Sequence, residues 1–554
     1  MPGLRLSSRL LLKPAALDNS GGVVNAGGVL TVRSGALNNQ TGTLASGSAV
    51  AITSQALNNA QGQISAQQTI SKTGSTGNVQ VDTGGQSLDN SQGLIVSANL
   101  LTVTTGAVRN TKGQIGALGS SSQASLSIGD LDNTNGLISA RTLGLTSTGA
   151  VTNAGGSLSA AQDLILIAQS VANTADASGT VAGQISAGRD LWLTARASLI
   201  NHAASVQSGR NAMLRLGTLT NDGGVLDSHG TLDVSVTDAA SNRGGVIRTA
   251  NAAGASSAGA LTLTAADFDN SAGTVNAATL LSITTGQLTN ANAGLLQASG
   301  GTLTLTARQV SNRSGAIVGA GDLSASTGAF DNTAGTISST SNLWLDTHSN
   351  ALMNAADGTH NASIQAGGTA TLTTGTLTNA ANGSTTAVIA AQHLSVIASS
   401  VVNAGTLAAG GTNAVDGSLA ITTSGALAND GGRIQAQGLV TTNSLRLSNQ
   451  AGKIVAASAS DSTAPVLQVT TNGTLDNSNH GLIAALDGDT TLSTQGGALK
   501  NSAAGVIYAK GALGLATGTL DNSSGGGLQS GGALSATTLA LNNTAGLIQG
   551  GSVF

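Results

Sequence analysis

The feature that most constrains the fold of this 554-residue chain is a short motif that recurs along nearly its whole length. The motif is an aliphatic residue, any residue, Asn, two small or polar residues, Gly, any residue, an aliphatic residue, any residue and a small residue. Copies stand at residues 37–46 (LNNQTGTLAS), 57–66 (LNNAQGQISA), 131–140 (LDNTNGLISA), 330–339 (FDNTAGTISS) and 541–550 (LNNTAGLIQG). A fixed period of this kind indicates a repeat architecture, in which each unit folds by stacking on its neighbours.

The Asn of the motif marks the register of the repeat. There are about 24 copies, most of them about 20 residues apart, and insertions lengthen some intervals to about 31 residues. The copies run from near residue 17 to the end without a change of composition. We therefore expect one repeat shaft over residues 17–554 and a lead-in or fragment boundary over residues 1–16. The predicted structural asparagines include Asn19, Asn39, Asn59, Asn90, Asn110, Asn133, Asn153, Asn173, Asn270, Asn332, Asn449, Asn477, Asn501, Asn522 and Asn543.

Segments between the motifs, such as residues 101–105 (LTVTT) and 261–265 (LTLTA), alternate apolar and polar residues, which is typical of β-strands. Because side chains alternate along a strand, residues two apart face the same side. The predicted inward pairs of one unit are Leu30 and Val32, Leu37 and Asn39, and Leu44 and Ser46. Three such strands make one coil of an all-β, right-handed parallel β-helix of triangular cross-section. We expect Gly at the corners because corners need positive φ.

The recurrent Asn has two possible placements. It can face inward and form a ladder of amide hydrogen bonds between coils. It can also sit in the left-handed region at a corner, which Asn tolerates. Its two-residue spacing from the preceding aliphatic residue favours the ladder. Both placements are structural, since a residue present in every coil does not define one active site.

Composition excludes several classes of function. Apolar residues make up 40% of the chain and recur at fixed places, so simple disorder is not expected. A formal charge of −4 gives no electrostatic case for a nucleic-acid partner. There is no Cys for a disulfide or thiol nucleophile, and no motif that implies a cofactor. Residues 4–12 only partly resemble a signal-peptide core, so we expect no signal peptide in this chain.

The tandem LDN-x-x-G-x-I-x-A motifs resemble the haemagglutinin repeats of filamentous haemagglutinins and of related contact-dependent inhibition exoproteins. The resemblance implies two-partner secretion through an outer-membrane transporter, a secreted or cell-surface location, and a role in adhesion or toxin presentation. It also implies a cell-surface receptor or glycan as a partner. The Asn-Pro motifs of the family's secretion domain are missing, and residues 188–190 are Gly-Arg-Asp, not Arg-Gly-Asp. The chain therefore resembles the shaft of such proteins, and its coil ends could associate end to end.

Four residues are candidates for binding on the surface of the shaft. Trp192 and Trp344 alternate with leucines, so they are expected to face outward, where an aromatic can stack on a sugar or anchor a partner. Coil stacking could align Arg189 with Arg210 in a basic patch for an anionic glycan. The competing interpretations are lone surface aromatics covered by loops, and charges that keep the surface from associating.

An enzyme of the glycan-degrading β-helix type is the alternative function. It needs clustered carboxylates, for which Asp487 and Asp489 are the candidates, although a solvated turn is the favoured interpretation. His348 and His360 are expected to share one inserted loop without a third ligand, so no metal site is predicted. The prediction is a non-enzymatic structural or adhesive shaft. A second alternative is a contact-dependent growth inhibition stalk whose toxin domain lies outside this chain.

Overall fold

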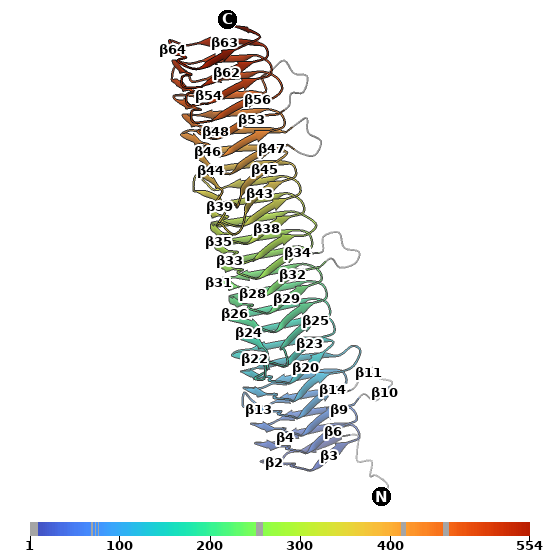
Figure 1. Ribbon diagram of the computed structural model, residues 1–554. Helices are drawn as coiled ribbons and strands as arrows, with labels where there is room; N and C mark the ends of the chain where they lie inside the picture. Colours follow the sequence, from blue (N-terminus) through green and yellow to red (C-terminus); the bar gives the residue numbers. More distant parts are fainter. Residues whose placement is uncertain are drawn as a thin grey trace. The chain divides into compact units, whose positions relative to one another are not determined.

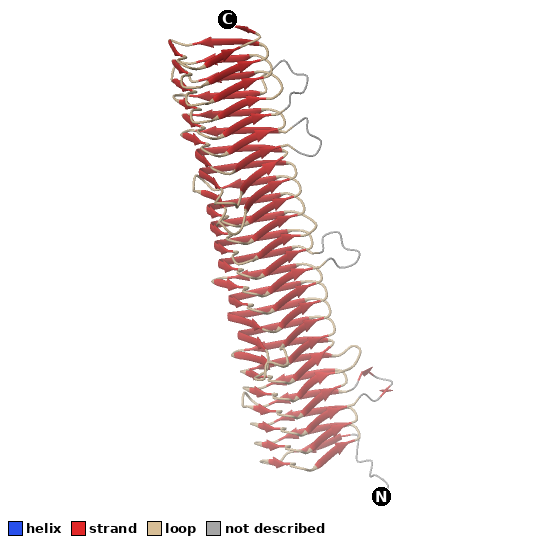
Figure 2. Ribbon diagram, viewed as in Figure 1, coloured by secondary structure: helices blue, strands red, loops and turns tan. Residues whose placement is uncertain are grey.

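The computed structural model describes residues 9–67, 70–71, 74–75, 77–250, 259–410, 417–457 and 465–553. Within them every regular element is a β-strand (Figure 2). The chain divides into two compact units, Met1–Asp269 with Gly273–Thr279, and Asn270–Ala272 with Leu280–Phe554. Both units consist of stacked coils (Figure 1). The predicted fold class is confirmed, since the described residues of each unit form the stacked, parallel-strand coils of a right-handed β-helix.

A coil of the first unit shows how the repeat folds. The motif's second half forms β6 (Thr43–Ser46), the alternating segment forms β7 (Ala49–Thr53), and the start of the next motif forms β8 (Leu57–Asn58). Each strand pairs in parallel with the same segment of the coil before it. These earlier strands are β3 (Val23–Ala26), β4 (Val29–Arg33) and β5 (Leu37–Asn38). The repeat therefore sets the register of the whole stack.

The core is the inside of each coil. All six predicted inward residues of residues 30–46 are buried, with exposed fractions of 3% or less. Aliphatic residues stack on aliphatic residues from coil to coil, as Leu44 does on Ile64. Apolar burial of this kind is the dominant favourable term in folding, and here it depends on neighbouring coils because one coil cannot enclose its own side chains.

Farther along the first unit the second and third strands of a coil merge. β24 (Leu164–Thr174), β26 (Leu191–His202) and β28 (Ala212–Thr220) each span both sides. The merged strands keep their corner as a register shift, between Ala168 and Ser170 in the pairing of β24 with β26. A shift of this kind bends the strand without interrupting the sheet.

The second unit repeats the same plan. β37 (Leu303–Ser311) pairs with β39 (Leu323–Asp331), and β38 (Ala316–Gly319) pairs with β40 (Thr336–Ser339). Long merged strands occur here too, in β44 (Thr369–Ala380) and β46 (His393–Asn403). The repeat therefore produces the same coil in both units.

The structure places the motif asparagines inside the coils as ladders of hydrogen-bonded amides. In the first unit the Nδ2 of Asn39 donates to the Oδ1 of Asn59 at 2.7 Å, and to the carbonyls of Gly42 and Gln63 at 3.2 Å each. The ladder crosses insertions, because Asn59 donates to Asn90 at 2.7 Å although 31 residues separate them. The first unit's ladder contains Asn19, Asn39, Asn59, Asn90, Asn110, Asn133, Asn153, Asn173, Asn201, Asn221 and Asn242.

The second unit has a ladder of its own with the same geometry. It contains Asn270, Asn290, Asn312, Asn332, Asn354, Asn379, Asn403, Asn429, Asn449, Asn477, Asn501, Asn522 and Asn543. An amide suits this position because it donates and accepts at once, and so satisfies both neighbouring coils. The ladder lets a polar group recur in the core without an unpaired amide.

The prediction that the motif glycine provides positive φ at a corner is wrong. Positive φ occurs one residue earlier, as at Thr41 (55°) and Gln61 (56°), and not at Gly42 or Gly62. A Cβ on Gly62 would lie 2.1 Å from the carbonyl oxygen of Asn39 and 2.7 Å from the Oδ1 of Asn59. Glycine is therefore required because the backbone approaches the amide ladder too closely for any side chain.

Two further segments concern the predicted lead-in and one of the insertions. β1 (Arg9–Leu12), within the expected lead-in, pairs in parallel with β4, while residues 1–8 of that lead-in lie outside the described residues. In the interval between Asn59 and Asn90, β10 (Ile70–Ser71) and β11 (Gly74–Ser75) form an antiparallel pair.

Candidate functional site

An apolar strip crosses three successive coils on the outer face of the first unit. Trp192 in β26 lies beside Ile165 of β24 and Met213 of β28, because all three occupy the same register position. Their exposed fractions are 40%, 43% and 40%, respectively. Three exposed apolar residues at one register position of successive strands form a contiguous apolar surface, whereas exposed apolar residues that stand singly are ordinary. We call Ile165, Trp192 and Met213 the apolar strip.

Two ion pairs lie at the start of the strands that carry the strip. The guanidinium of Arg189 donates to both carboxylate oxygens of Asp163, with Nε at 3.0 Å from Oδ1. Arg210 binds Asp190 in the same two-point manner, with Nε at 2.8 Å from Oδ1. These hydrogen bonds hold the pKa values of Asp163 and Asp190 below their ordinary range. Both aspartates therefore stay ionised and balance the arginines' charge.

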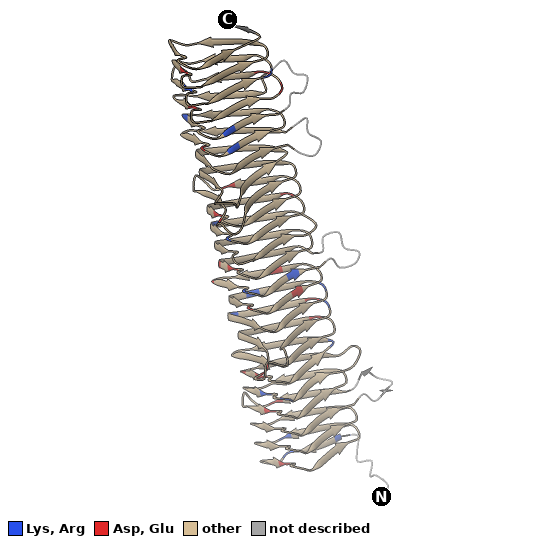
Figure 3. Cartoon of the chain, viewed as in Figure 1, with Lys and Arg blue, Asp and Glu red and all other residues tan. Residues whose placement is uncertain are grey.

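The predicted alignment of Arg189 with Arg210 is present, since the backbone N–H of Arg210 donates to the carbonyl of Arg189 at 2.8 Å. Each guanidinium is nevertheless occupied by its aspartate. The charge of each of these two arginines is thus balanced by an aspartate, and charged residues are sparse along the chain (Figure 3). Beside the apolar strip, the two arginines therefore act as ordered, charge-balanced side chains and do not create a basic patch.

Trp344 lies in the second unit, in β41 (Leu343–Asp346), and is 41% exposed. Its register neighbours are Ser324 and Thr371, which are small and polar. The structure thus brings Trp192, Arg189 and Arg210 close together and leaves Trp344 without apolar neighbours at its register position. Ile165 and Met213 were missed by sequence reasoning, because their contact with Trp192 depends on coil register and no motif marks it.

Carboxylates line a surface hollow of about 710 Å³ in the first unit, where Asp89, Asp130 and Asp132 lie near Arg109. Their oxygens accept local hydrogen bonds. Asp89 Oδ1 accepts from the N–H of Ser91 at 2.8 Å, and Asp130 Oδ1 accepts from the N–H of Ala150 at 2.8 Å.

Asp132 shows what these contacts do to acidity. Burial acts to raise the pKa of Asp132, but hydrogen bonds from Thr134 and Thr111 outweigh it, so the pKa lies below its ordinary value. A general acid for glycoside hydrolysis needs a raised pKa instead. Asp132 therefore does not provide the acid that such a reaction uses.

The predicted pair Asp487 and Asp489 is also engaged in local contacts. Asp487 binds the Nζ of Lys510 at 3.0 Å, and Asp489 accepts the N–H of Ala512 at 2.7 Å. Both contacts tie one coil to the next.

The two histidines do not share a loop as predicted. β42 (Leu352–Ala355) separates His348 from His360, because the inserted segment re-enters the sheet between them. His348 lies 3.9 Å from Asp346, and His360 lies 3.3 Å from Asp357. Among the described residues, no three His or Asp side chains are grouped so that they could hold a metal ion. In that same part of the chain, no helix has the length and apolar character needed to cross a membrane.

Stacked coils, internal asparagine ladders and a repeat-wide core define a solenoid-type repeat protein. The family model of the haemagglutinin repeat matches residues 14–72, 172–255, 239–307, 298–352 and 484–551, which together exceed half of the chain. The chain belongs to this family, and it is a haemagglutinin-repeat shaft region of the filamentous haemagglutinin type. Comparison with curated proteins gives no match, and comparison with solved structures gives none either.

Proposed function

We propose that the chain is the shaft of a secreted, surface-associated exoprotein of the filamentous haemagglutinin type. The observation that carries the proposal is the asparagine ladder, which repeats one polar contact from coil to coil among the described residues of each unit. A ladder of this kind adds length without adding a distinct site. The work of such a chain is mechanical, since a stack of paired coils holds whatever it carries at a set distance.

The proposal includes no enzymatic activity. The carboxylates that could serve catalysis, in the hollow around Asp132 and at Asp487 and Asp489, bind neighbouring backbone or side-chain groups. The family membership supports secretion through an outer-membrane two-partner transporter and contact with a receptor or glycan on another cell. It equally supports a stalk for contact-dependent inhibition, whose toxin domain lies outside this chain.

Deletion of whole coils tests the shaft. Removal of residues 40–59 joins Asn39 to Ala60 and preserves the register of the ladder, whereas removal of residues 40–49 breaks it. We expect the exoprotein to keep its folding and its attachment to cells after the first deletion, and to lose both after the second. Incubation with acidic polysaccharides should release no new reducing ends. Loss of attachment from a correctly folded whole-coil deletion, or release of reducing ends, would contradict a mechanical role.

The apolar strip favours a second function, direct contact of the shaft with a partner. A rigid tryptophan flanked by Ile165 and Met213 is a suitable anchor, and such anchors often carry more than 1 kcal/mol of binding energy. We expect Trp192→Ala to weaken attachment of the purified chain to cells by about tenfold or more. Trp344→Ala is the matched control, because that tryptophan is equally exposed among small polar neighbours. Equal effects of the two substitutions would count against the strip.

A further inference from the structure

One column of residues at the turn before the long strands of the first unit contains three arginines. Backbone hydrogen bonds join Gln162 to Arg141 at 2.7 Å, Arg189 to Gln162 at 2.8 Å, and Arg210 to Arg189 at 2.8 Å. These four residues therefore occupy the same position in four successive coils. We call them the turn column.

The next residue along the chain forms a second column, and it supplies the carboxylates. Asp163 follows Gln162, and Asp190 follows Arg189. Each paired arginine binds the aspartate of the coil before it, so Arg189 binds Asp163 and Arg210 binds Asp190. An arginine in the turn column thus has a defined position for its carboxylate partner.

For Arg141 that position carries no carboxylate. The pairing of β18 (Gln123–Ile128) with β21 (Thr142–Ser147) aligns Gln123 with Thr142, and the pairing of β21 with β24 aligns Leu143 with Leu164. Gln123 therefore occupies, relative to Arg141, the position that Asp163 occupies relative to Arg189. The guanidinium of Arg141 has no ion pair and donates no hydrogen bond to the residues that the structure describes.

Burial makes this arginine unusual. In the described part of the chain only Arg141 and Arg215 are half-buried, while the other arginines are exposed. Arg215 binds Asp233 at 2.6 Å. A cation that has lost part of its water without gaining a counter-charge favours the arrival of an anion.

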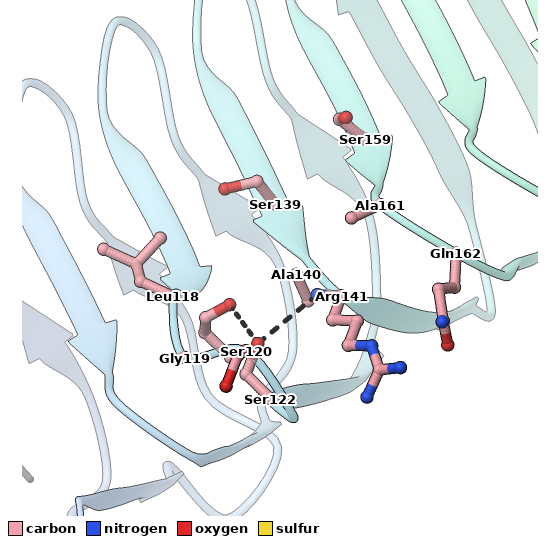
Figure 4. Close-up of a pocket in the computed structure, with 11 residues that line it drawn as sticks. Leu118, Gly119, Ser120, Ser122, Ser139, Ala140, Arg141, Ser159, Ala161 and Gln162 are labelled. Carbon is pink, nitrogen blue, oxygen red and sulfur yellow. Dashed lines mark hydrogen bonds between the residues drawn. The ribbon is translucent and has the colours of Figure 1, made fainter.

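Arg141 lines a pocket of about 470 Å³. An insertion at Leu118–Ser122 forms one wall, and the remaining lining includes alanines together with Ser139, Ser159 and Gln162. In Figure 4 the Arg141 side chain projects on the same side as those of Ser122 and Gln162. The insertion is anchored because Ser122 Oγ donates to the carbonyl of Ala117 at 2.6 Å and accepts from the N–H of Arg141 at 3.3 Å. The volume lies within the range of small-ligand sites.

We propose that this pocket binds the carboxylate of an external ligand, which takes the place that Asp163 and Asp190 fill for the other arginines. The guanidinium fork receives both carboxylate oxygens, as it does in the two internal pairs. The Gln162 amide, which projects on the same side as Arg141, contacts the atoms around the carboxylate (Figure 4). The carboxylate can come from an acidic sugar or from a peptide, and the site recognises the group that they share.

Calorimetric titration of the whole chain tests the proposal. The probes are sodium glucuronate, N-acetylglutamate and acetate, with sodium chloride at equal ionic strength as the blank. We expect saturable binding of at least one of the first two. Gln123→Asp supplies the missing internal carboxylate and Arg141→Gln removes the fork, so each should weaken binding by at least about tenfold, as expected for a lost charged hydrogen-bond pair. Gln123→Asn and Arg196→Gln, an exposed arginine outside the pocket, should leave it within about twofold.

Gln123→Asp separates loss of binding from loss of folding. Gln123→Asp removes no native contact of Arg141, and the ion pair it creates should leave the melting temperature equal or higher, so lost binding then reflects an occupied guanidinium. Tighter binding of glucuronate would identify a sugar source, and tighter binding of N-acetylglutamate a peptide source. Absence of saturable binding by all three carboxylates, or full binding by Gln123→Asp, would overturn the proposal.

Discussion

Replacement of one ladder asparagine by alanine should destabilise the coils around it far more than replacement of its neighbour. Asn59 is fully buried, and its Nδ2 donates to Asn90 Oδ1 at 2.7 Å, to Gly62 O at 3.2 Å and to Leu94 O at 3.3 Å. Its Oδ1 accepts from the Nδ2 of Asn39 at 2.7 Å. Asn59→Ala removes all four hydrogen bonds and leaves a cavity between two coils.

The expected loss of stability follows from the buried acceptor that the substitution leaves without a donor. Asn90 Oδ1 loses the amide that reaches it, and a buried unsatisfied acceptor costs about 1–3 kcal/mol. The cavity adds to this cost. A total of about 3 kcal/mol corresponds to roughly a 100-fold increase in local opening. Asn58→Ala is the matched control, since Asn58 is only half-buried and its side chain makes two outer hydrogen bonds, donating to Asn38 at 3.1 Å and accepting from the N–H of Ala60 at 3.0 Å.

Hydrogen exchange resolved by mass spectrometry is the suitable assay, because a long stack of coils does not unfold in one step. Amides of β8 and β9 (Gln63–Ala66) should exchange roughly 100-fold faster in Asn59→Ala. The same amides should change by less than about fivefold in Asn58→Ala, as for a surface hydrogen bond. Equal acceleration by the two substitutions would refute the ladder as the main polar support of the core.

Three further predictions test the core, the motif glycine and the ion pairs. Leu372→Ala in β44 should lower local stability by about 2–5 kcal/mol, seen as faster exchange in the adjacent coils, because Leu372 is fully buried. Gly62→Ala should be at least as disruptive as Asn59→Ala by the same measurement, since its Cβ would lie 2.1 Å from a backbone oxygen, and normal exchange would disprove the steric reason. Arg210 lowers the pKa of Asp190 in the folded state, so the pair stabilises the fold above the ordinary pKa of about 3.8 and stops doing so as pH falls through the lowered value. In thermal melts, the melting temperature of Asp190→Asn should therefore lie below that of the parent at pH 7. The two melting temperatures should converge at strongly acidic pH.

Much of the fold was predictable from the sequence because the same residues recur at nearly constant spacing. The positions of Leu30, Val32, Leu37 and Leu44 follow from two-residue alternation within strands. The sequence also narrowed the motif asparagine to two placements. The two-residue spacing favoured the ladder but could not establish it, since a ladder depends on an amide in the next coil being within hydrogen-bond distance.

The candidate sites were less accessible to prediction. Trp192 could be placed on an outer face from alternation alone, but its neighbours Ile165 and Met213 could not. The aspartates that bind Arg189 and Arg210 lie 26 and 20 residues away, and this separation varies because insertions lengthen some coils. No fixed spacing therefore marks an ion pair in the sequence.

The sequence by itself determined the coil: its period, its inward residues and the need for many copies. The tertiary structure decided what the coils place side by side. It showed that the motif glycine avoids a clash with the preceding coil, and it left Arg141 opposite Gln123 where other arginines face an aspartate. The physical reason is that alternation acts within one strand, whereas these contacts arise from strand pairing between coils whose lengths differ.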